Sequence, residues 1–483
     1  MNIAMITPEA VPFAKTGGLA EVTTSLSLEL EKLGHNVVMV MPFYKVIKDN
    51  KDIKVKMLDT IVSAWFLNRQ SEGRVYYANI GKYLLVYFIE NDEFFNREGL
   101  YGTYQGDYVD NGFRFGFFAK AVINLLPKIG FQPDIIHVHD WQTSLIPLLL
   151  KTVEKGNDFY KSTKTILTIH NIAYQGLVPT QMVPELGLSW DVYNPFTGIE
   201  FYGNVNYLKA GIVSADVITT LSGKYSKEIQ SDDHGFGLSG TLRGRNKNLY
   251  GVPVGVNYSR WNPSTDEYIK AKFDVDNFDG RHKCRQDLLK EFELSARDNV
   301  PIIGVIARLV DVKGADILLK SLNGLSELNL RLVLLGVGDD KYLKLFGEAK
   351  ELYSSWMGAK FAVSAPIAHQ IVAGSDMFLM PSKIEPMGQY QMYAMRYGSV
   401  PIVRATGSLD DTIIEYNPKI GKGTGFKFSE YSSEALINAV KKAVKLFKDK
   451  AEWQKILRNA MIQNFSWQKC AEGFEEMYKK VKS

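Results

Sequence analysis

A glutamate stands in a loop after a short apolar run in the last third of the chain. The run Met377–Met380 is broken by a proline and a serine, and Glu385 follows beside Pro386 and Gly388. Such a break is typical of a parallel strand that reaches the edge of its sheet, where open α/β sheets bind ligands. We therefore expect Glu385 to face a crevice, together with a second glycine loop at 406–407. Taken alone, the motif favours an ordinary βαβ unit whose glutamate is solvated, so the rest of the chain must support the crevice.

Three basic residues stand in comparable places. Lys15 precedes the pair Gly17 and Gly18 before the first helix, Arg308 follows an apolar run, and Lys313 precedes another helix. Glycines let the backbone approach a ligand closely, and free N–H groups at a helix start bind phosphate. Cations near such groups suit a diphosphate leaving group, whose charge grows as its bond to a sugar breaks. The Lys15 loop has neither Walker A nor G-x-G-x-x-G spacing, so a plain tight turn remains the alternative there.

Histidines end or follow two apolar runs of the first half. The run Ile135–His139 places His137 and His139 on one face of a strand, where either a metal pair or hydrogen-bonded packing can be expected. No third metal ligand stands nearby, which favours packing. A second run, Ile166–Ile169, ends directly before His170 and a loop closed by glycine. His170 is therefore the better candidate for the crevice.

The apolar runs fall into two sets, which indicates two α/β domains. The strand Ile3–Thr7, a helix over 20–33 and the strand Val37–Met41 predict a right-handed βαβ unit. Between the sets, Tyr250–Asp266 is rich in Gly, Pro and Asn and has no sustained period, so we place the domain junction there. Two such sheets would turn their carboxyl-end loops toward one cleft. The other expected elements are a helix over Asn204–Ala215 and strands over Val217–Leu221, Ile302–Ala307, Leu332–Leu335, Met377–Met380 and Val400–Val403.

Composition limits the classes of partner. The 483 residues suffice for two or three domains, and 46% hydrophobic with 23% charged residues is typical of globular proteins. A net charge of +4, evenly spread, predicts no nucleic-acid binding and suits a small anionic ligand. Cys284 and Cys470 lie far apart, so neither a disulfide framework nor a zinc site is expected. With no signal-peptide pattern and no apolar run of membrane-spanning length, we expect a cytoplasmic protein without a membrane partner.

The motifs occur together, and in the same order, in one known family. They are KTGGLAE from Lys15, HDWQT from His139, HNIAYQG from His170, ARL from Ala307 with Lys313-Gly314, and Pro381-Ser382 with Glu385-Pro386 and Gly388. With these, the chain resembles the bacterial glycogen synthase and plant starch synthase family nearly end to end.

The resemblance implies an α/β fold of the GT-B class, with two doubly wound Rossmann-like domains facing across a cleft. Residues 1–250 would form the acceptor and catalytic domain, residues 251–463 the nucleotide-sugar-binding domain, and residues 464–483 a last helix that returns to the first domain. The implied activity is retaining transfer of glucose from ADP-glucose to the non-reducing end of an α-1,4-glucan, in glycogen or starch biosynthesis. The implied partners are a nucleotide sugar and the glucan, with no metal or other cofactor.

The resemblance also assigns roles to matching residues. Lys15 would meet the phosphates and sugar of the donor, and Arg308 and Lys313 would neutralise the departing diphosphate. The backbone carbonyl of His170 would stabilise positive charge at the anomeric carbon, while Glu385 would hold the sugar hydroxyls. No second carboxylate is placed for double displacement, so front-face attack fits as well as a nucleophilic glutamate. The implied substrate-binding residues are Gly17, Gly18, Glu21, Asp140, Trp141, Asn171, Gly338, Met387, Gly388 and Tyr390.

Some positions depart from the family pattern. Met387 and Tyr390 stand where cysteine and threonine are usual, Val254 replaces a polar sugar contact, and Val363 stands where an aromatic residue stacks on adenine. Losing one hydrogen bond to the sugar costs about 1–3 kcal/mol. Two alternatives therefore stay open: a related GT-B glycosyltransferase with a different donor or acceptor, and a weakly active glucan-binding or regulatory paralogue.

Overall fold

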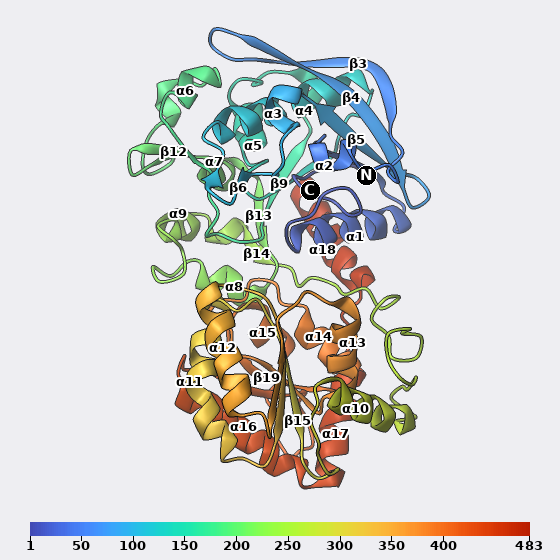
Figure 1. Cartoon of the computed structure of the whole chain (residues 1–483). Helices are drawn as coiled ribbons and strands as arrows, with labels where there is room; N and C mark the ends of the chain where they lie inside the picture. Colours follow the sequence, from blue (N-terminus) through green and yellow to red (C-terminus); the bar gives the residue numbers. More distant parts are fainter. The chain divides into compact units, whose positions relative to one another are not determined.

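Two sheets built mainly from parallel strands, each in its own unit of the chain, form the framework of the computed structural model, which describes residues 1–483 (Figure 1). The first unit comprises Met1–Leu221, Ser226–Val254 and Trp467–Ser483. The second comprises Ser222–Tyr225 and Gly255–Ser466. The main boundary follows Val254, within the segment Tyr250–Asp266 where the sequence predicts the junction.

The sheet of the first unit has nine strands in the order β14-β13-β9-β8-β1-β2-β5-β4-β3. Its strands from β14 to β5 are parallel and largely buried, as expected where helices cover both faces of such a sheet. β4 instead pairs antiparallel with β3 and β5. The strands are β1 (Asn2–Ile6), β2 (Asn36–Pro42), β3 (Lys56–Trp65), β4 (Gln70–Ile80), β5 (Leu84–Glu90), β8 (Ile135–His139), β9 (Lys164–Ile169), β13 (Val217–Thr220) and β14 (Leu249–Gly251).

Helices and two small sheets complete the first unit. The small sheets are β6 (Gly102–Thr103) with β7 (Gly106–Asp107), and β10 (Leu177–Val178), β12 (Asn204–Asn206) and β11 (Glu200–Phe201). The helices are α1 (Leu19–Lys32), α2 (Lys45–Lys48), α3 (Asp92–Phe95), α4 (Asn111–Lys128), α5 (Leu145–Lys151), α6 (Met182–Glu185), α7 (Tyr207–Ser214), α9 (Ser239–Gly244) and α18 (Trp467–Lys482), with α8 (Gly223–Glu228) at the boundary between the units.

One predicted helix of this unit begins later than expected. The helix expected over Asn204–Ala215 is a short strand, β12, followed by the helix α7. Asn206 separates them, because its side chain accepts a hydrogen bond from the backbone N–H of Lys209 and so caps the helix.

The last helix packs beside the first one. In Figure 1 the red helix α18 lies against the blue helix α1, and residue contacts between the two agree. Phe474 and Tyr478 of α18 are fully buried, and the Tyr478 hydroxyl lies 2.8 Å from Nδ1 of His137 in β8. The end of the chain is thus part of the core of the first unit.

The second unit has a six-stranded, wholly parallel sheet in the order β17-β16-β15-β18-β19-β20. Its strands are β15 (Ile302–Ile306), β16 (Arg331–Leu335), β17 (Met357–Lys360), β18 (Met377–Met380), β19 (Val400–Arg404) and β20 (Phe426–Phe428). Its helices are α10 (Asp279–Glu291), α11 (Ala315–Ser326), α12 (Asp340–Leu352), α13 (Ala365–Gly374), α14 (Tyr390–Arg396), α15 (Gly407–Thr412), α16 (Ser433–Phe447) and α17 (Lys450–Met461).

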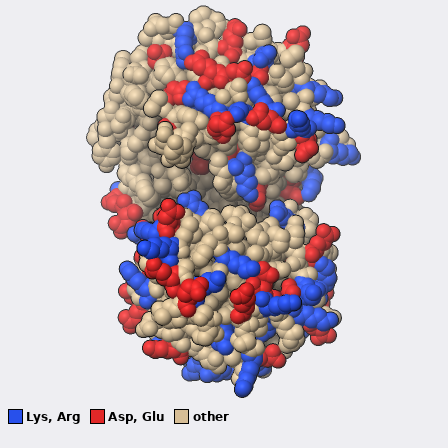
Figure 2. All heavy atoms as spheres, in the orientation of Figure 1, with Lys and Arg blue, Asp and Glu red and all other residues tan.

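Charge is unevenly distributed over the surface of the first unit. Figure 2 shows lysines, arginines and carboxylates gathered on one side of this unit, whereas the side over α6 and β12 is largely uncharged. No helix is both long enough and apolar enough to cross a bilayer.

Candidate functional site

Glu385 is a buried carboxylate held by the loop that follows β18. It is 5% exposed, and Nζ of Lys313 lies 2.8 and 2.7 Å from its two carboxylate oxygens. The Ser382 hydroxyl and the backbone N–H of Gly388 also donate to it, at 3.0 and 3.2 Å. Because the carboxylate is buried and hydrogen-bonded on several sides, it is fixed in one orientation, while Lys313 remains partly open to solvent.

Glycines let neighbouring loops close around Glu385. Gly407 has φ +46°, and a Cβ there would lie 2.0 Å from the carbonyl oxygen of Glu385. The next residue, Ser408, donates its backbone N–H to that same carbonyl at 3.0 Å. Gly314 has φ +80°, and a Cβ there would lie 2.2 Å from the carbonyl oxygen of Pro381. The loops after β15, β18 and β19 are therefore interlocked, and only glycine fits at both contacts.

Arg308 and Gly338 lie on adjoining loops at the carboxyl ends of β15 and β16. The backbone of Leu309 joins these loops, donating to Val337 and accepting from Asp339 at 2.8 and 3.0 Å. A Cβ at Gly338 would lie 2.2 Å from the Leu309 carbonyl oxygen, so this position also requires glycine. The Arg308 side chain is exposed and makes no ion pair, so its charge is available to a ligand.

Met387 and Tyr390, which replace the usual family residues, lie next to the Glu385 loop and are half-buried. The Tyr390 ring stacks on Phe378 of β18 and meets the edge of Trp261. The tyrosine is therefore part of the packing at the start of α14. Val363, by contrast, is 88% exposed.

In the first unit, Lys15 is not the free charge that the sequence suggested. Its Nζ lies 2.5 Å from a carboxylate oxygen of Glu21, another predicted site residue, and both side chains are partly exposed. Such an exposed pair stabilises the protein little, so a phosphate can compete with Glu21 for the lysine.

Glu9 is a site residue that the sequence reasoning missed. It is 3% exposed and accepts hydrogen bonds from the Thr16 backbone N–H at 2.6 Å, the Thr16 hydroxyl at 2.5 Å and the Gly17 N–H at 3.3 Å. The Tyr101 hydroxyl donates to it at 2.7 Å, and burial holds the pKa of this phenol well above its usual range. The Gly17 amide, predicted to bind phosphate, thus faces a carboxylate. A glutamate just past the carboxyl end of the first strand was the available signal.

Asp140 organises the loop that contains His170 and Asn171. It is buried, has φ +53°, and accepts the His170 backbone N–H at 2.7 Å. Burial raises its pKa to about 7, against the opposing effect of the His170 and Asn171 amides. Burial also lowers the pKa of His170 to about 3, so this imidazole is neutral near pH 7. The side chain of Asp140 therefore fixes the position of the His170 backbone.

The histidines of β8 are packed and hydrogen-bonded, as the alternative to a metal pair predicted. His137 bonds to Tyr478 and to the hydroxyl of Thr168, and Nδ1 of His139 lies 3.0 Å from Nε2 of His170. Nowhere in the chain do three or more His, Cys, Asp or Glu side chains form a group suited to a metal ion.

Trp141 lines a hollow of 670 Å³ in the first unit, which we call the tryptophan hollow. The ring is held edge-on against Phe115, with centroids 4.8 Å apart. Gly176 has φ +64°, and a Cβ there would lie 2.3 Å from the indole, so glycine is required beside it. The other lining residues include Tyr108, Asn111, Tyr174, Gln175, Phe201 and Phe236. An aromatic wall with amide groups beside it suits a sugar.

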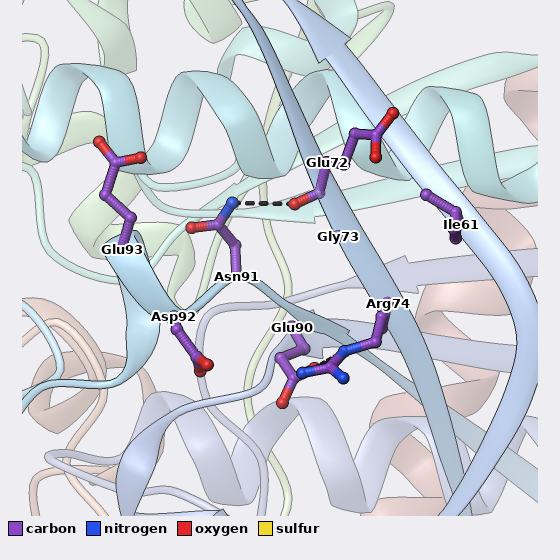
Figure 3. A pocket seen from close by; sticks show the side chains of 8 residues that line it. All are labelled: Ile61, Glu72, Gly73, Arg74, Glu90, Asn91, Asp92 and Glu93. Carbon is purple, nitrogen blue, oxygen red and sulfur yellow. Dashed lines mark hydrogen bonds and ion pairs between the residues drawn. The ribbon is translucent and has the colours of Figure 1, made fainter.

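A smaller hollow of 240 Å³ near β4 and β5 is lined by acidic side chains (Figure 3), most of which pair with cations. Glu90 pairs with Arg74 and Lys48, and Glu93 pairs with Arg69. We assign no function to it.

The structure thus brings the predicted residues together in two sets. Glu385, Lys313, Gly388, Met387 and Tyr390 form one set in the second unit, with Arg308 and Gly338 on the neighbouring loops. Asp140, Trp141, His170 and Asn171 form another in the first unit. There Lys15, Gly17 and Gly18 lie on the loop bound by Glu9, and Glu21 lies in the first turn of α1. That the two sets face one cleft stays a prediction.

Sequence comparison identifies both halves of the chain. The family described as starch synthase catalytic domain matches residues 2–244, and the family described as glycosyl transferases group 1 matches residues 288–464.

Relatives match over the full length. The glycogen synthase of Koribacter versatilis is 42% identical over 100% of this chain and 98% of its own, and that of Geotalea daltonii is 41% identical over 100% and 99%.

Solved structures agree with the sequence comparison. The catalytic domain of starch synthase IV from Arabidopsis thaliana, bound to ADP and acarbose, has a TM-score of 0.88 and 30% identity, covering 99% of both chains. A sucrose-phosphate synthase from Thermosynechococcus elongatus has a TM-score of 0.61 at 16% identity, covering 99% of this chain and 98% of its own, which shows the fold alone. The predicted GT-B fold class is confirmed.

Proposed function

Because the chain belongs to the family of bacterial glycogen synthases and plant starch synthases, and is a glucosyltransferase, we propose that it transfers glucose from ADP-glucose to the non-reducing end of an α-1,4-glucan. The observation that carries the proposal is the buried Glu385 carboxylate with Lys313 bound to both its oxygens. This pair offers an acceptor for sugar hydroxyls next to a cation for a phosphate.

In the proposed reaction, the bond between the glucose C1 and the diphosphate oxygen breaks, and ADP leaves with the electron pair. The 4-hydroxyl of the glucan attacks C1 from the same face, and its proton passes to the departing phosphate oxygen. Lys313 and Arg308 neutralise the charge that develops on the phosphate, so the step requires no metal ion. When the donor binds, the Lys15 ammonium leaves the Glu21 carboxylate and pairs with a donor phosphate.

Residues of the first unit bind the donor glucose and the acceptor end of the glucan. The His170 imidazole is neutral near pH 7, and the role proposed for this residue is that of its backbone carbonyl, whose position Asp140 fixes through the His170 N–H. The tryptophan hollow receives the acceptor end of the glucan. Exclusion of water from the reacting atoms prevents hydrolysis of the donor. We place this activity in the cytoplasm, where a nucleotide sugar is available.

A different donor is the second candidate. Val363 is 88% exposed at the position where an aromatic residue would stack on adenine. The residues of the site therefore specify the nucleotide base less clearly than the diphosphate. The ADP bound in the solved starch synthase favours the adenine nucleotide.

Incubation with glycogen and either labelled ADP-glucose or labelled UDP-glucose tests the proposal. We expect faster incorporation of label from ADP-glucose. Incorporation from UDP-glucose alone would establish the second candidate, and glycogen binding without incorporation from either donor would show a regulatory paralogue.

A further inference from the structure

Tyr431 stands just before α16 and contacts all three interlocked loops of the second unit. These loops follow β15, β18 and β19 and carry Lys313, Glu385 and Gly407. We propose that Tyr431 is a positioning residue for glucosyl transfer, which acts through Lys313 and Glu385 by holding them in their mutual geometry. The inference rests on the roles that the proposed function gives to these two residues.

The hydroxyl of Tyr431 binds both ends of the turn that carries Lys313. It donates to a carboxylate oxygen of Asp316 and lies 3.1 Å from the carbonyl oxygen of Asp311. Burial, together with the bond to Asp316, raises the pKa of this phenol, so the hydroxyl keeps its proton at neutral pH and remains a donor. Because Asp311 precedes Lys313 and Asp316 follows it, one hydroxyl restrains the backbone on both sides of the lysine.

The ring of Tyr431 faces cations from the other two loops. Nζ of Lys383 lies 5.7 Å from the ring centroid and Cζ of Arg404 lies 5.4 Å from it, both within the range of cation–π attraction. Arg404 also donates to the carbonyl oxygen of Lys383 at 2.8 Å, and the Lys383 backbone N–H donates to the carbonyl oxygen of Val312 at 2.9 Å. The ring therefore joins the loop that carries Glu385 to the turn that the hydroxyl restrains.

The backbone of Tyr431 is itself held by a capped helix. The next residue, Ser432, is the N-cap of α16, and its hydroxyl oxygen accepts a hydrogen bond from the Ala435 backbone N–H at 3.2 Å. The helix packs against α11 and β20, and Leu436 and Val440 on its inner face are fully buried. A side chain that starts from so rigid an element can fix the position of loops that have no core of their own.

The test removes first the hydroxyl and then the ring. Tyr431→Phe keeps the ring beside the two cations, whereas Tyr431→Leu keeps neither contact. We expect kcat with ADP-glucose and glycogen to fall about three- to tenfold in Tyr431→Phe and about ten- to a hundredfold in Tyr431→Leu, because a displaced Lys313 stabilises the departing diphosphate less well. KM for glycogen is expected to stay the same, since the residues proposed to bind the acceptor belong to the first unit.

Tyr416→Phe is the matched control. Tyr416 also belongs to the second unit, is 5% exposed, and donates its hydroxyl to a carboxylate oxygen of Glu452 in α17 at 2.8 Å. This substitution removes a comparable hydrogen bond and is expected to leave kcat at the wild-type value. An equal fall in kcat in Tyr416→Phe and Tyr431→Phe would reduce the effect to a loss of stability and overturn the proposal.

Amide hydrogen exchange measures the restraint on the loops without turnover. In Tyr431→Phe we expect faster exchange in residues 309–316 and 382–389 and wild-type exchange in the strands of the sheet. Unchanged exchange in these two segments would overturn the proposal, as would wild-type kcat in both Tyr431 variants. If the wild type transfers no glucose but the exchange difference is present, the proposed function fails while the restraint by Tyr431 is supported.

Discussion

The buried carboxylate of Glu9 holds the Lys15 loop in place through hydrogen bonds. Its carboxylate accepts hydrogen bonds from the backbone and hydroxyl of Thr16 and from the Gly17 backbone. Phe13 anchors the start of the loop against Phe88 in the core, and Glu9 holds the stretch at Thr16 and Gly17. Glu9 positions the loop and is not itself expected to touch the reacting atoms.

Glu9→Gln is expected to lower kcat/KM for the nucleotide sugar about ten- to a hundredfold, because a small displacement of the loop misplaces Lys15. Steady-state kinetics with varied donor check this, and KM for glycogen is expected to stay the same. Glu351→Gln, on the exposed surface of α12, is the matched control. A Glu9→Gln enzyme with wild-type donor kinetics would show that the loop is held by other contacts.

Asp140 is expected to confer a pH dependence. Its pKa of about 7 means that the group gains its charge as the pH rises through neutrality, and the ionised form is the stronger acceptor for the His170 amide. We expect kcat to rise with pH with a midpoint near 7, and this inflection to disappear in Asp140→Asn. Rate profiles between pH 5.5 and about 8.5 give the answer. An unchanged inflection in the variant would assign it to another group.

At the scale of elements, the interlocked loops of the second unit depend on glycine. Gly407→Ala places a Cβ against the Glu385 carbonyl, at 2.0 Å in the present geometry, so the loop must move and the carboxylate with it. We expect kcat to fall at least about tenfold in an otherwise folded protein.

Gly421→Ala is the matched control for this prediction. Gly421 also has a left-handed backbone, φ +63°, but a Cβ there would meet only the Lys455 side chain, at 3.7 Å. Both variants therefore carry backbone strain, and only Gly407→Ala disturbs Glu385. Equal activity in the two variants would contradict the role of the interlock.

The strands were predictable because buried parallel strands are continuous apolar runs. Met377–Met380 and Ile135–His139 were predicted with their observed bounds. The helix predicted over Asn204–Ala215 begins only at Tyr207, because its start depends on a side-chain cap at Asn206. The Glu9 contacts and the Lys15–Glu21 pair could not be predicted, since they depend on how a loop folds over its own strand.

At the scale of the whole molecule, the end of the chain completes the first unit. Tyr478→Phe removes the hydroxyl that bonds to Nδ1 of His137 and leaves that buried nitrogen without a partner. We expect the free energy of unfolding of the first unit to fall by about 1–3 kcal/mol, measured by urea denaturation. Tyr83→Phe, on an exposed turn, is expected to have no effect. Equal stability of the two variants would show that α18 is held by apolar packing alone.

The overall architecture was predictable for a different reason from the strands. Repeated apolar runs indicated two α/β domains, but only the ordered motifs from Lys15 to Gly388 identified the GT-B class. Apolar patterning could not reveal that the antiparallel β3–β4 hairpin extends the first sheet, because the side chains of these strands alternate between core and solvent.

Proton NMR of the transfer reaction tests the central claim most directly. The protein is incubated with ADP-glucose and maltopentaose, and new anomeric signals and released ADP are followed together, with Lys313→Met as the comparison. We predict new α-1,4 linkages in equal amount to ADP, and a kcat for Lys313→Met lower by about 10²–10³. New β-linkages, ADP release without a new linkage, or wild-type turnover by Lys313→Met would contradict the account.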